Sequence, residues 1–330
     1  MSRSLSLRAL LPVSIAIAVA CTSASADAAS LTKVADFNPA LGQLPESITS
    51  DGAGNLFMSM RNTVQRLTPG GVLSTYATLP VPSGVLAAGL KFDDEGDLFV
   101  ATGSLHPDPP AAFIWRVDEV GAVSMHAELD PQGFPNDLAF DDHDNLFVTD
   151  PLQGRIWRVD ADGEPTVWME HPALEGDEEE PYLVLSHFGV DGIAFDKYKK
   201  WIYVSNLDYG TILRVKVKAD GTAGPLEIYV DDFDALAGAD GIAFDSGGNL
   251  YVAVNGQDRL VMIDPWRNVH VLAEGGLLDS PSALVFGGSG CHARDLYVTN
   301  FAITRAYGIK EGAPHPSLVK MSTWYPGLPL

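Results

Sequence analysis

Residues 191–206 read DGIAFDKYKKWIYVSN, and residues 240–255 read DGIAFDSGGNLYVAVN. Each stretch is a short apolar run, a polar turn and a second apolar run, which is the pattern of a β-hairpin. Four more copies of this pattern occur, at 46–60 (ESITSDGAGNLFMSM), 88–102 (AGLKFDDEGDLFVAT), 136–150 (NDLAFDDHDNLFVTD) and 282–300 (SALVFGGSGCHARDLYVTN). The residue that ends the first run recurs every 42–55 positions, at Asp51, Asp93, Asp141, Asp196, Asp245 and Gly287. A β pattern that repeats every 40–50 residues or so is typical of propeller blades.

Two further apolar runs follow each hairpin, for example FIWRVDE at 113–119 and VSMHAEL at 123–129. Four strands per repeat predict an all-β, six-bladed β-propeller. The sixth repeat has a third run at 317–321 and then a Pro/Gly tail, so it lacks a fourth strand. Residues 31–37 (LTKVADF) resemble the fourth runs of the other repeats. We therefore expect this N-terminal strand to complete the sixth blade and close the ring.

The first residues have the composition of a secretory signal peptide. Arg3 and Arg8 precede an apolar stretch at 9–20, and Ala24-Ser25-Ala26 offers a small-residue cleavage site. The chain thus divides into a signal peptide at 1–26 and one propeller domain at 27–330, and the protein is expected to be exported. Cys21 also lies in a loose lipobox (AVAC, 18–21), so processing as a lipoprotein is the alternative. The apolar stretch is too short to span a membrane, so no integral membrane segment is expected after processing.

The formal charge of −22 argues against nucleic acid and anionic membrane surfaces as partners. Cys291 is the single cysteine left after residue 26, so no disulfide stabilises the predicted domain. The sequence does not identify a protein partner.

The propeller topology gathers the beginnings of the six first strands around the axis, on one face. The residues at that position are Glu46, Ala88, Asn136, Asp191, Asp240 and Ser282, and one layer further out lie Asp150, Asn206, Asn255 and Asn300. Carboxylates that converge on a narrow axis repel one another, and a bound cation would relieve this repulsion. Oxygen ligands suit a hard ion such as Ca²⁺, and the absence of a matching His or Cys set argues against zinc. Two insertions, at 103–112 and 170–190, are predicted to cover this face.

These motifs resemble those of the SMP-30/gluconolactonase/LRE-like family. The resemblance covers residues 31–330 and rests on Pro45-Glu46, Pro135-Asn136-Asp137, Val190 to Ala194 (VDGIA) and Ala239 to Ala243 (ADGIA). It implies a six-bladed propeller that binds one divalent cation in the central channel. Many members of the family hydrolyse lactones, and the paraoxonase-type lactonases share the architecture.

The resemblance assigns roles by position. The metal-binding Glu of the family falls on Glu46, its Asn ligand in the fourth blade on Asp191 and its Asp ligand in the fifth blade on Asp240. Asn136 matches a residue that binds either the metal or the substrate. Asp191 in place of Asn adds a negative charge, which favours Ca²⁺. Phe134 stands where sugar-lactone hydrolases of the family carry a substrate-binding Arg, so a less polar lactone or ester is expected.

The implied chemistry is metal-assisted attack of water on a lactone or ester, with Asp240 or Asp191 as the base. His187, four residues before Asp191, is a further candidate for a substrate contact or second base, and its alternative is a polar loop residue. A non-enzymatic NHL-like binding propeller with a structural metal is the competing function. A propeller lyase or a quinoprotein dehydrogenase is disfavoured, because no His/Arg/Lys constellation for either is found in the sequence.

Overall fold

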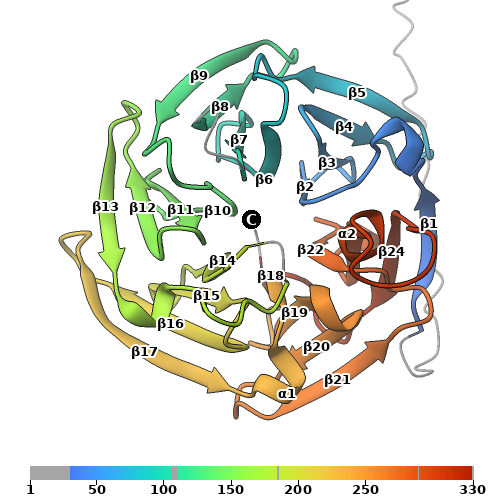
Figure 1. The fold of residues 1–330 in the computed structure, drawn as a ribbon. Coiled ribbons are helices and arrows are strands. Elements are labelled where there is room, and N and C mark those ends of the chain that lie inside the picture. The colour runs from blue at the N-terminus through green and yellow to red at the C-terminus, as the bar shows by residue number, and fades with distance from the viewer. Residues whose placement is uncertain (1–29, 106–110, 184–185, 289, 329–330) are drawn as a thin grey trace, which may run out of the picture.

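The computed structural model describes residues 30–105, 111–183, 186–288 and 290–328. Six four-stranded antiparallel sheets surround a central axis, which confirms the predicted six-bladed propeller (Figure 1). The predicted signal peptide and Cys21 lie outside the described residues. Within the part of the chain that is described, no helix is long and apolar enough to cross a membrane.

Each blade runs from an inner strand at the axis to an outer strand at the rim. Blade one holds β2 (Ile48–Ser50), β3 (Leu56–Met60), β4 (Thr63–Leu67) and β5 (Leu73–Thr78). Blade two holds β6 (Leu86–Phe92), β7 (Leu98–Gly103), β8 (Ala112–Val117) and β9 (Val123–Glu128). Blade three holds β10 (Leu138–Phe140), β11 (Leu146–Asp150), β12 (Arg155–Val159) and β13 (Pro165–Glu170).

The remaining blades repeat this order. Blade four holds β14 (Val190–Asp196), β15 (Trp201–Asn206), β16 (Thr211–Val217) and β17 (Ala223–Asp231). Blade five holds β18 (Ala239–Phe244), β19 (Leu250–Val254), β20 (Arg259–Ile263) and β21 (Val269–Glu274). Blade six holds β22 (Pro281–Phe286), β23 (Asp295–Asn300), β24 (Ser317–Ser322) and β1 (Thr32–Asp36). The connections hold α1 (Phe233–Leu236), α2 (Ile303–Ala306) and the 3-10 turns η1 (Pro39–Leu41), η2 (Pro172–Leu174), η3 (Asn255–Gln257) and η4 (Gly290–His292).

The N-terminal strand closes the ring, as the sequence predicted. β1 pairs antiparallel with β24, with Thr32 opposite Lys320 and Asp36 opposite Ser317. Figure 1 shows the two strands, blue and red, side by side. Phe37 follows directly and is buried in an apolar cluster that contains residues of both blade one and blade six. The first and last parts of the chain therefore share one sheet and one core, which leaves β24 no exposed edge.

Apolar side chains of adjacent blades pack together and form the core between them. One cluster joins Phe99 and Ile114 of blade two to Leu138 and Val148 of blade three. Another joins Ile212 of blade four to residues of blade five. Because every blade buries its faces against its two neighbours, the ring is stabilised as one cooperative unit.

Close packing of the inner strands explains the glycine of the DGIA motif. A Cβ atom on Gly192 would lie 2.3 Å from the Asp240 carbonyl oxygen, and one on Gly241 would lie 2.6 Å from the Ser282 carbonyl oxygen. A Cβ atom on Gly89 would likewise lie 2.3 Å from the Asn136 carbonyl oxygen. Only glycine fits where these backbones approach each other, so the residues that line the axis are held at a fixed spacing.

We expect Gly192→Ala to lower the free energy of unfolding by about 1–3 kcal/mol, because the added methyl group meets backbone that cannot move aside. Gly70→Ala is the matched control. Its Cβ would lie 3.8 Å from the nearest atom, in ordinary contact, so stability should change little. Urea unfolding followed by tryptophan fluorescence measures both, and equal effects would contradict the close approach of the inner strands.

Candidate functional site

A cavity of about 160 Å³ lies on the axis, on the face where the inner strands begin. Side chains from all six blades and from the loops above them surround it. Its polar lining residues are Glu46, Arg61, Asn136, Asp191, Asp240 and Asn255. The others are Leu44, Leu86, Ala87, Ala88, Leu105, Phe134, Leu183, Phe188, Leu207, Phe301, Ile303 and Tyr307. The cavity is thus a mostly apolar chamber with a polar centre, which is the usual character of a small-molecule site.

The four residues predicted to bind the metal meet in this cavity. Asp191 and Asp240 are the second residues of β14 and β18, and Glu46 and Asn136 lie two residues before β2 and β10. At Asp191 and Asp240 the pairing register shifts, so each inner strand carries a bulge there. Bulges of this kind redirect a side chain beside a site, and here the two carboxylates line the cavity.

Hydroxyl groups on the second strands fix the backbone of these residues. Ser205 accepts the N–H of Gly192 in its own blade at 2.8 Å and donates to the carbonyl of Asp240 in the next blade at 2.7 Å. The same bridge recurs at Thr149, between the N–H of Asp137 and the carbonyl of Asp191, and at Thr299, between the N–H of Ala283 and the carbonyl of Glu46. Adjacent blades are therefore linked through the backbone of the carboxylate residues.

Burial and mutual repulsion govern the electrostatics of the cavity. Burial raises the pKa of Glu46, Asp191 and Asp240 well above the usual range. The next largest cause is repulsion by a neighbouring carboxylate of the same three. Asp191 raises the pKa of Glu46, Asp240 raises the pKa of Asp191, and Glu46 raises the pKa of Asp240. Hydrogen bonds from Ser59 to Glu46 and from Asn255 to Asp240 oppose the shift. Three such groups favour a bound cation, which would stabilise their ionised form.

Two amide side chains complete the polar centre. Asn136 donates its amide N–H to Oδ1 of Asp191, and Asn255 donates to Oδ2 of Asp240 at 3.1 Å. Asn255 is 2% exposed, and its own Oδ1 has no hydrogen-bond partner among the described residues. A buried acceptor without a partner is costly, and a cation would satisfy it. No His or Cys is among the lining residues, so the donor set fits a hard, oxygen-binding cation.

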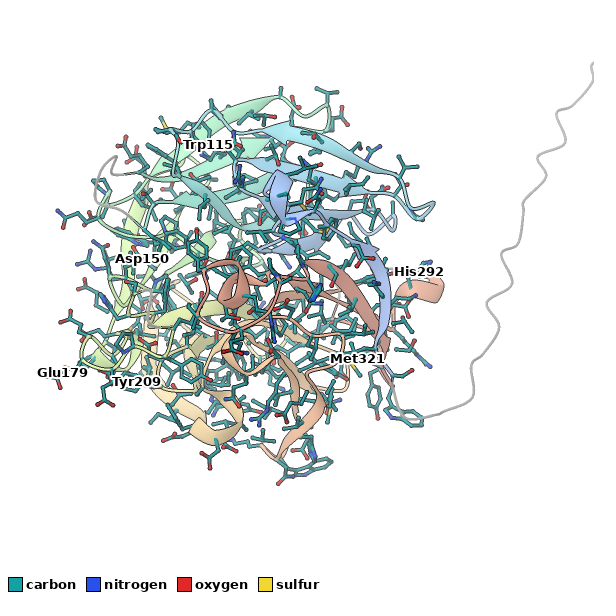
Figure 2. The ribbon with its side chains drawn as sticks, turned by 45° about the vertical axis from the view of Figure 1, so that its right-hand side comes forward. Trp115, Asp150, Glu179, Tyr209, His292 and Met321 are labelled. Carbon is teal, nitrogen blue, oxygen red and sulfur yellow. The ribbon has the colours of Figure 1, made fainter. Side chains whose placement is uncertain are left out.

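Phe134 belongs to the wall of the cavity and is held there by Asp150. The backbone N–H of Phe134 donates to Oδ1 of Asp150 at 3.0 Å, and Trp157 donates its indole N–H to Oδ2 of the same carboxylate at 3.3 Å. Asp150, labelled in Figure 2, is fully buried, and burial raises its pKa while these hydrogen bonds oppose the rise. The carboxylate one layer out from the axis therefore positions an apolar wall residue.

Both insertions contribute to the wall, as expected for segments that cover this face. Leu105 comes from the first insertion, and Leu183 and Phe188 come from the second. Asp208 accepts the backbone N–H groups of Asp177, Tyr182 and Phe188, which anchors the second insertion. The acidic side chains at 178–180 are exposed, and Figure 2 shows Glu179 at the edge of the molecule, away from the axis.

His187 does not line the cavity. Its Nε2 atom lies 3.2 Å from the carbonyl oxygen of Leu152. The structure therefore gives His187 no substrate contact in this cavity.

Glu46, Asp191 and Asp240 line one cavity, but their ligand atoms do not all lie within 4.8 Å of one another. Among the described residues, the one group of three carboxylates with ligand atoms within 4.8 Å of one another is Asp93, Glu95 and Asp97, in the turn after β6. Asp93 accepts the backbone N–H groups of Glu95 and Asp97, and Asp97 pairs with Arg116. Asp93, Glu95 and Asp97 are therefore residues that stabilise the turn after β6.

Sequence reasoning missed several parts of the site. Arg61 and Tyr307 line the cavity from connections that no repeat motif marks. The bridging hydroxyls do have a signal, because Thr149, Ser205 and Thr299 recur in the runs FVTD, YVSN and YVTN of the hairpin repeats. The unpaired oxygen of Asn255 depends on side-chain orientation, which the sequence does not reveal.

Solved structures of similar fold include a luciferin-regenerating enzyme (15% identity, TM-score 0.66, covering 91% of this chain and 98% of that one). A candidate gluconolactonase is similar at 17% identity and TM-score 0.66, covering 92% and 94%. Regucalcin from Agrobacterium tumefaciens, described as a calcium-binding protein, is similar at 19% identity and TM-score 0.60, covering 87% and 93%. At these identities the likeness shows the fold alone.

A comparison with curated proteins found no match. Residues 184–302 match the model of the SMP-30/gluconolactonase/LRE-like region. This segment contains Asp191 and Asp240 and runs through blades four and five into blade six. The chain therefore carries an SMP-30/gluconolactonase/LRE-like region within a six-bladed propeller, which confirms the family resemblance of its sequence motifs.

Proposed function

We propose that this protein is an exported hydrolase of lactones or esters that depends on one divalent cation, with Ca²⁺ as the favoured ion. The observation that carries the proposal is the convergence of three buried carboxylates and the unpaired Asn255 oxygen in one largely apolar cavity. The matched family region includes lactonases, which supports a hydrolase of this broad type. The calcium-binding description of the regucalcin neighbour supports the choice of ion.

Glu46, Asp191 and Asp240 would hold the cation, with the amide oxygens of Asn136 and Asn255 as further ligands. Carboxylate and amide oxygens are the donors that Ca²⁺ takes, and several acidic ligands raise its affinity. When bound, such a cation polarises the carbonyl of the ester and stabilises the negative charge that develops on its oxygen.

Asp240 or Asp191 takes the proton of the attacking water. Both carboxylates line the cavity beside the site proposed for the cation, so each is placed to accept a proton from water held there. The water oxygen bonds to the acyl carbon, the acyl C–O bond breaks, and the abstracted proton passes to the leaving oxygen. The products are an acid and an alcohol, joined in one hydroxy acid when the substrate is a lactone.

The lining favours a substrate of low polarity. Phe134, Leu105, Leu183 and Phe188 form an apolar wall, and burying apolar substrate surface against it contributes about 25 cal/mol per Å². Arg61 is the one cationic side chain among the lining residues. A polyhydroxylated sugar lactone would find few partners along this wall, whereas an alkyl or aryl lactone fits it.

The stabilisation by Ca²⁺ should grow as the pH rises. In the calcium-free fold the three carboxylates keep protons at pH values where the unfolded chain has lost them, because their folded pKa is raised. The stability of the calcium-free protein therefore falls from about pH 4 upward, by up to about 1.4 kcal/mol per group and pH unit. Bound Ca²⁺ removes this penalty. We expect the difference in Tm between Ca²⁺ and EGTA to widen from about pH 5 to about pH 8, and a constant difference would contradict it.

The experiment that tests the function is acid release from a panel of alkyl lactones, sugar lactones and aryl esters by purified protein, with Ca²⁺ and with EGTA. We expect calcium-dependent turnover, fastest for the apolar members. Phe134→Arg should shift the preference toward sugar lactones. Calcium binding without turnover of any member would replace the hydrolase with the NHL-like binding propeller.

A further inference from the structure

A second cavity lies on the same axis, further along the inner strands. Its volume is about 150 Å³, and each inner strand contributes residues that follow the ring position, such as Leu90 and Lys91 in β6 and Ile242 to Phe244 in β18. The first cavity holds Ala88 and Asp240 from the same strands. The two cavities therefore follow one another along the channel, with the proposed catalytic cavity at one end and this lower cavity at the other.

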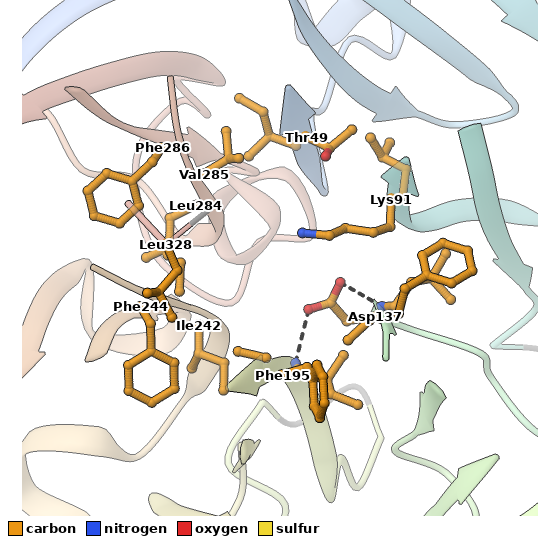
Figure 3. Close-up of a pocket in the computed structure, with 18 of the residues that line it drawn as sticks. Thr49, Lys91, Asp137, Phe195, Ile242, Phe244, Leu284, Val285, Phe286 and Leu328 are labelled. Carbon is orange, nitrogen blue, oxygen red and sulfur yellow. Dashed lines mark hydrogen bonds between the residues drawn. The ribbon is translucent and has the colours of Figure 1, made fainter. Parts of the chain in front are cut away.

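The walls of the lower cavity differ sharply in polarity. Figure 3 shows Lys91 and Asp137 on one side, and Phe244, Phe286 and Leu328 on the other. Lys91, Asp137 and Lys197 are the charged lining residues, and all but Thr49 of the others are apolar. The lining contains two lysines and one aspartate, so its formal charge is positive in a protein whose formal charge is −22.

Asp137 has backbone hydrogen-bond partners, whereas the Lys91 ammonium has none among the described residues. Oδ1 of Asp137 accepts the N–H of Leu138 at 2.8 Å, and Oδ2 accepts the N–H of Ile193 at 3.0 Å. Within the described part of the chain, the Lys91 ammonium makes no hydrogen bond or ion pair and interacts with Asp137 only through space. Burial lowers the pKa of Lys91. A cationic donor without a partner, opposite an aromatic and aliphatic wall, matches an anion with an apolar body.

We propose that the lower cavity binds a small apolar monocarboxylate, with its carboxylate on Lys91 and its hydrocarbon part against Phe244, Phe286 and Leu328. One negative charge balances the net charge of the lining, and a bidentate or charge-assisted contact would satisfy the ammonium. An apolar cavity of this volume admits a benzene-sized group. Benzoate and hexanoate therefore have the right size and charge. This site is separate from the proposed hydrolytic one and stands or falls independently of it.

The segment that contains Gly327 and Leu328 contributes to the lining and would contact the ligand. The Leu328 N–H donates to the carbonyl oxygen of Phe244 at 3.0 Å, and the Gly327 N–H donates to that of Ala293 at 3.0 Å. This segment therefore crosses from blade five to blade six. A Cβ on Gly327 would lie 2.4 Å from the Phe286 side chain, so only glycine lets the segment lie this close. Leu328 is thus held in the lining.

Calorimetric titration of the full-length mature protein with benzoate and hexanoate in EGTA tests the proposal. EGTA removes any cation that could hold the anion in the upper cavity, and the lower-cavity variants then assign the binding that remains. We expect saturable binding with a Kd below about 1 mM for wild type. Lys91→Met should bind at least tenfold more weakly, because a charge-assisted contact is lost. Lys33→Met, which removes an exposed lysine of β1, is the matched control and should bind as wild type does.

A second variant keeps the test decisive if Lys91→Met fails to fold. Ala243 lines the cavity, and Ala243→Leu fills part of it while Lys91 remains. This variant should lose hexanoate binding. Hexanol, which matches hexanoate but has no charge, should bind at least tenfold more weakly than the acid.

Absence of saturable binding to wild type would overturn the proposal, as would equal affinity for hexanol and hexanoate or unchanged binding in both variants. A comparison of hexanoate with 6-hydroxyhexanoate then separates the two sources of such an acid. Tighter binding of the hydroxy acid assigns the site to a lactone hydrolysis product, and tighter binding of hexanoate assigns it to a free fatty acid. Either order supports a monocarboxylate site.

Discussion

Asp240→Asn should lower the affinity for Ca²⁺ by about 100-fold or more, equivalent to about 2.7 kcal/mol, and should raise the stability of the calcium-free protein at about pH 8. The two effects have opposite signs because Asp240 has two roles. It is one of three carboxylates that would hold the cation, and without a cation it is a buried charge that Glu46 repels. Asparagine keeps the shape and the contact with Asn255 but removes the charge.

Calcium titration by calorimetry and urea unfolding in EGTA measure the two effects separately. Asp245→Asn is the matched control, because Asp245 is also fully buried in blade five but accepts hydrogen bonds from Gly247 and Asn249 in the β18–β19 turn. This control should lose about 1–3 kcal/mol of stability and keep its calcium affinity. If Asp240→Asn binds Ca²⁺ as wild type does, Asp240 is not a ligand and the assignment of the calcium site is wrong.

The repeat pattern was sufficient to predict the architecture, because hairpin periodicity and turn residues are local properties. It also identified the members of the ring, since equivalent positions of a propeller must converge on the axis. Glu46, Asn136, Asp191 and Asp240 do line one cavity. The closure by residues 31–37 followed from counting strands, and the pairing of β1 with β24 confirms it.

Features that depend on the relative placement of distant side chains were not predictable in this way. His187 is only four residues from Asp191, yet it does not line the cavity. Arg61 is remote from every motif and lies in the lining. The lower cavity could not be predicted, because Lys91 and Asp137 occur in different repeats and resemble ordinary strand residues. Within loops, proximity in sequence to a site residue does not predict which side chains line the cavity. Equivalent positions in the repeats do predict them.

Removal of residues 31–37 should destabilise the entire domain, not one blade. β24 would lose its partner strand, and the apolar cluster between blades six and one would lose Phe37, which is 7% exposed. Loss of a buried Phe side chain alone costs about 3–5 kcal/mol. Together with the lost strand pairing we expect about 5 kcal/mol or more, a fall in Tm of roughly 10 °C for a domain of this size.

Thermal unfolding followed by circular dichroism measures this loss. Val34→Ser is the matched control, because Val34 is on the same strand but 39% exposed, and its effect on Tm should be small. Phe37→Ala should account for more than half of the loss, since it empties the cluster while leaving β1 paired. Because every blade buries its faces against two neighbours, an open ring exposes blade six and blade one at once, and unfolding should remain a single transition at the lower temperature. An unchanged Tm would mean that β1 covers an edge without contributing to closure.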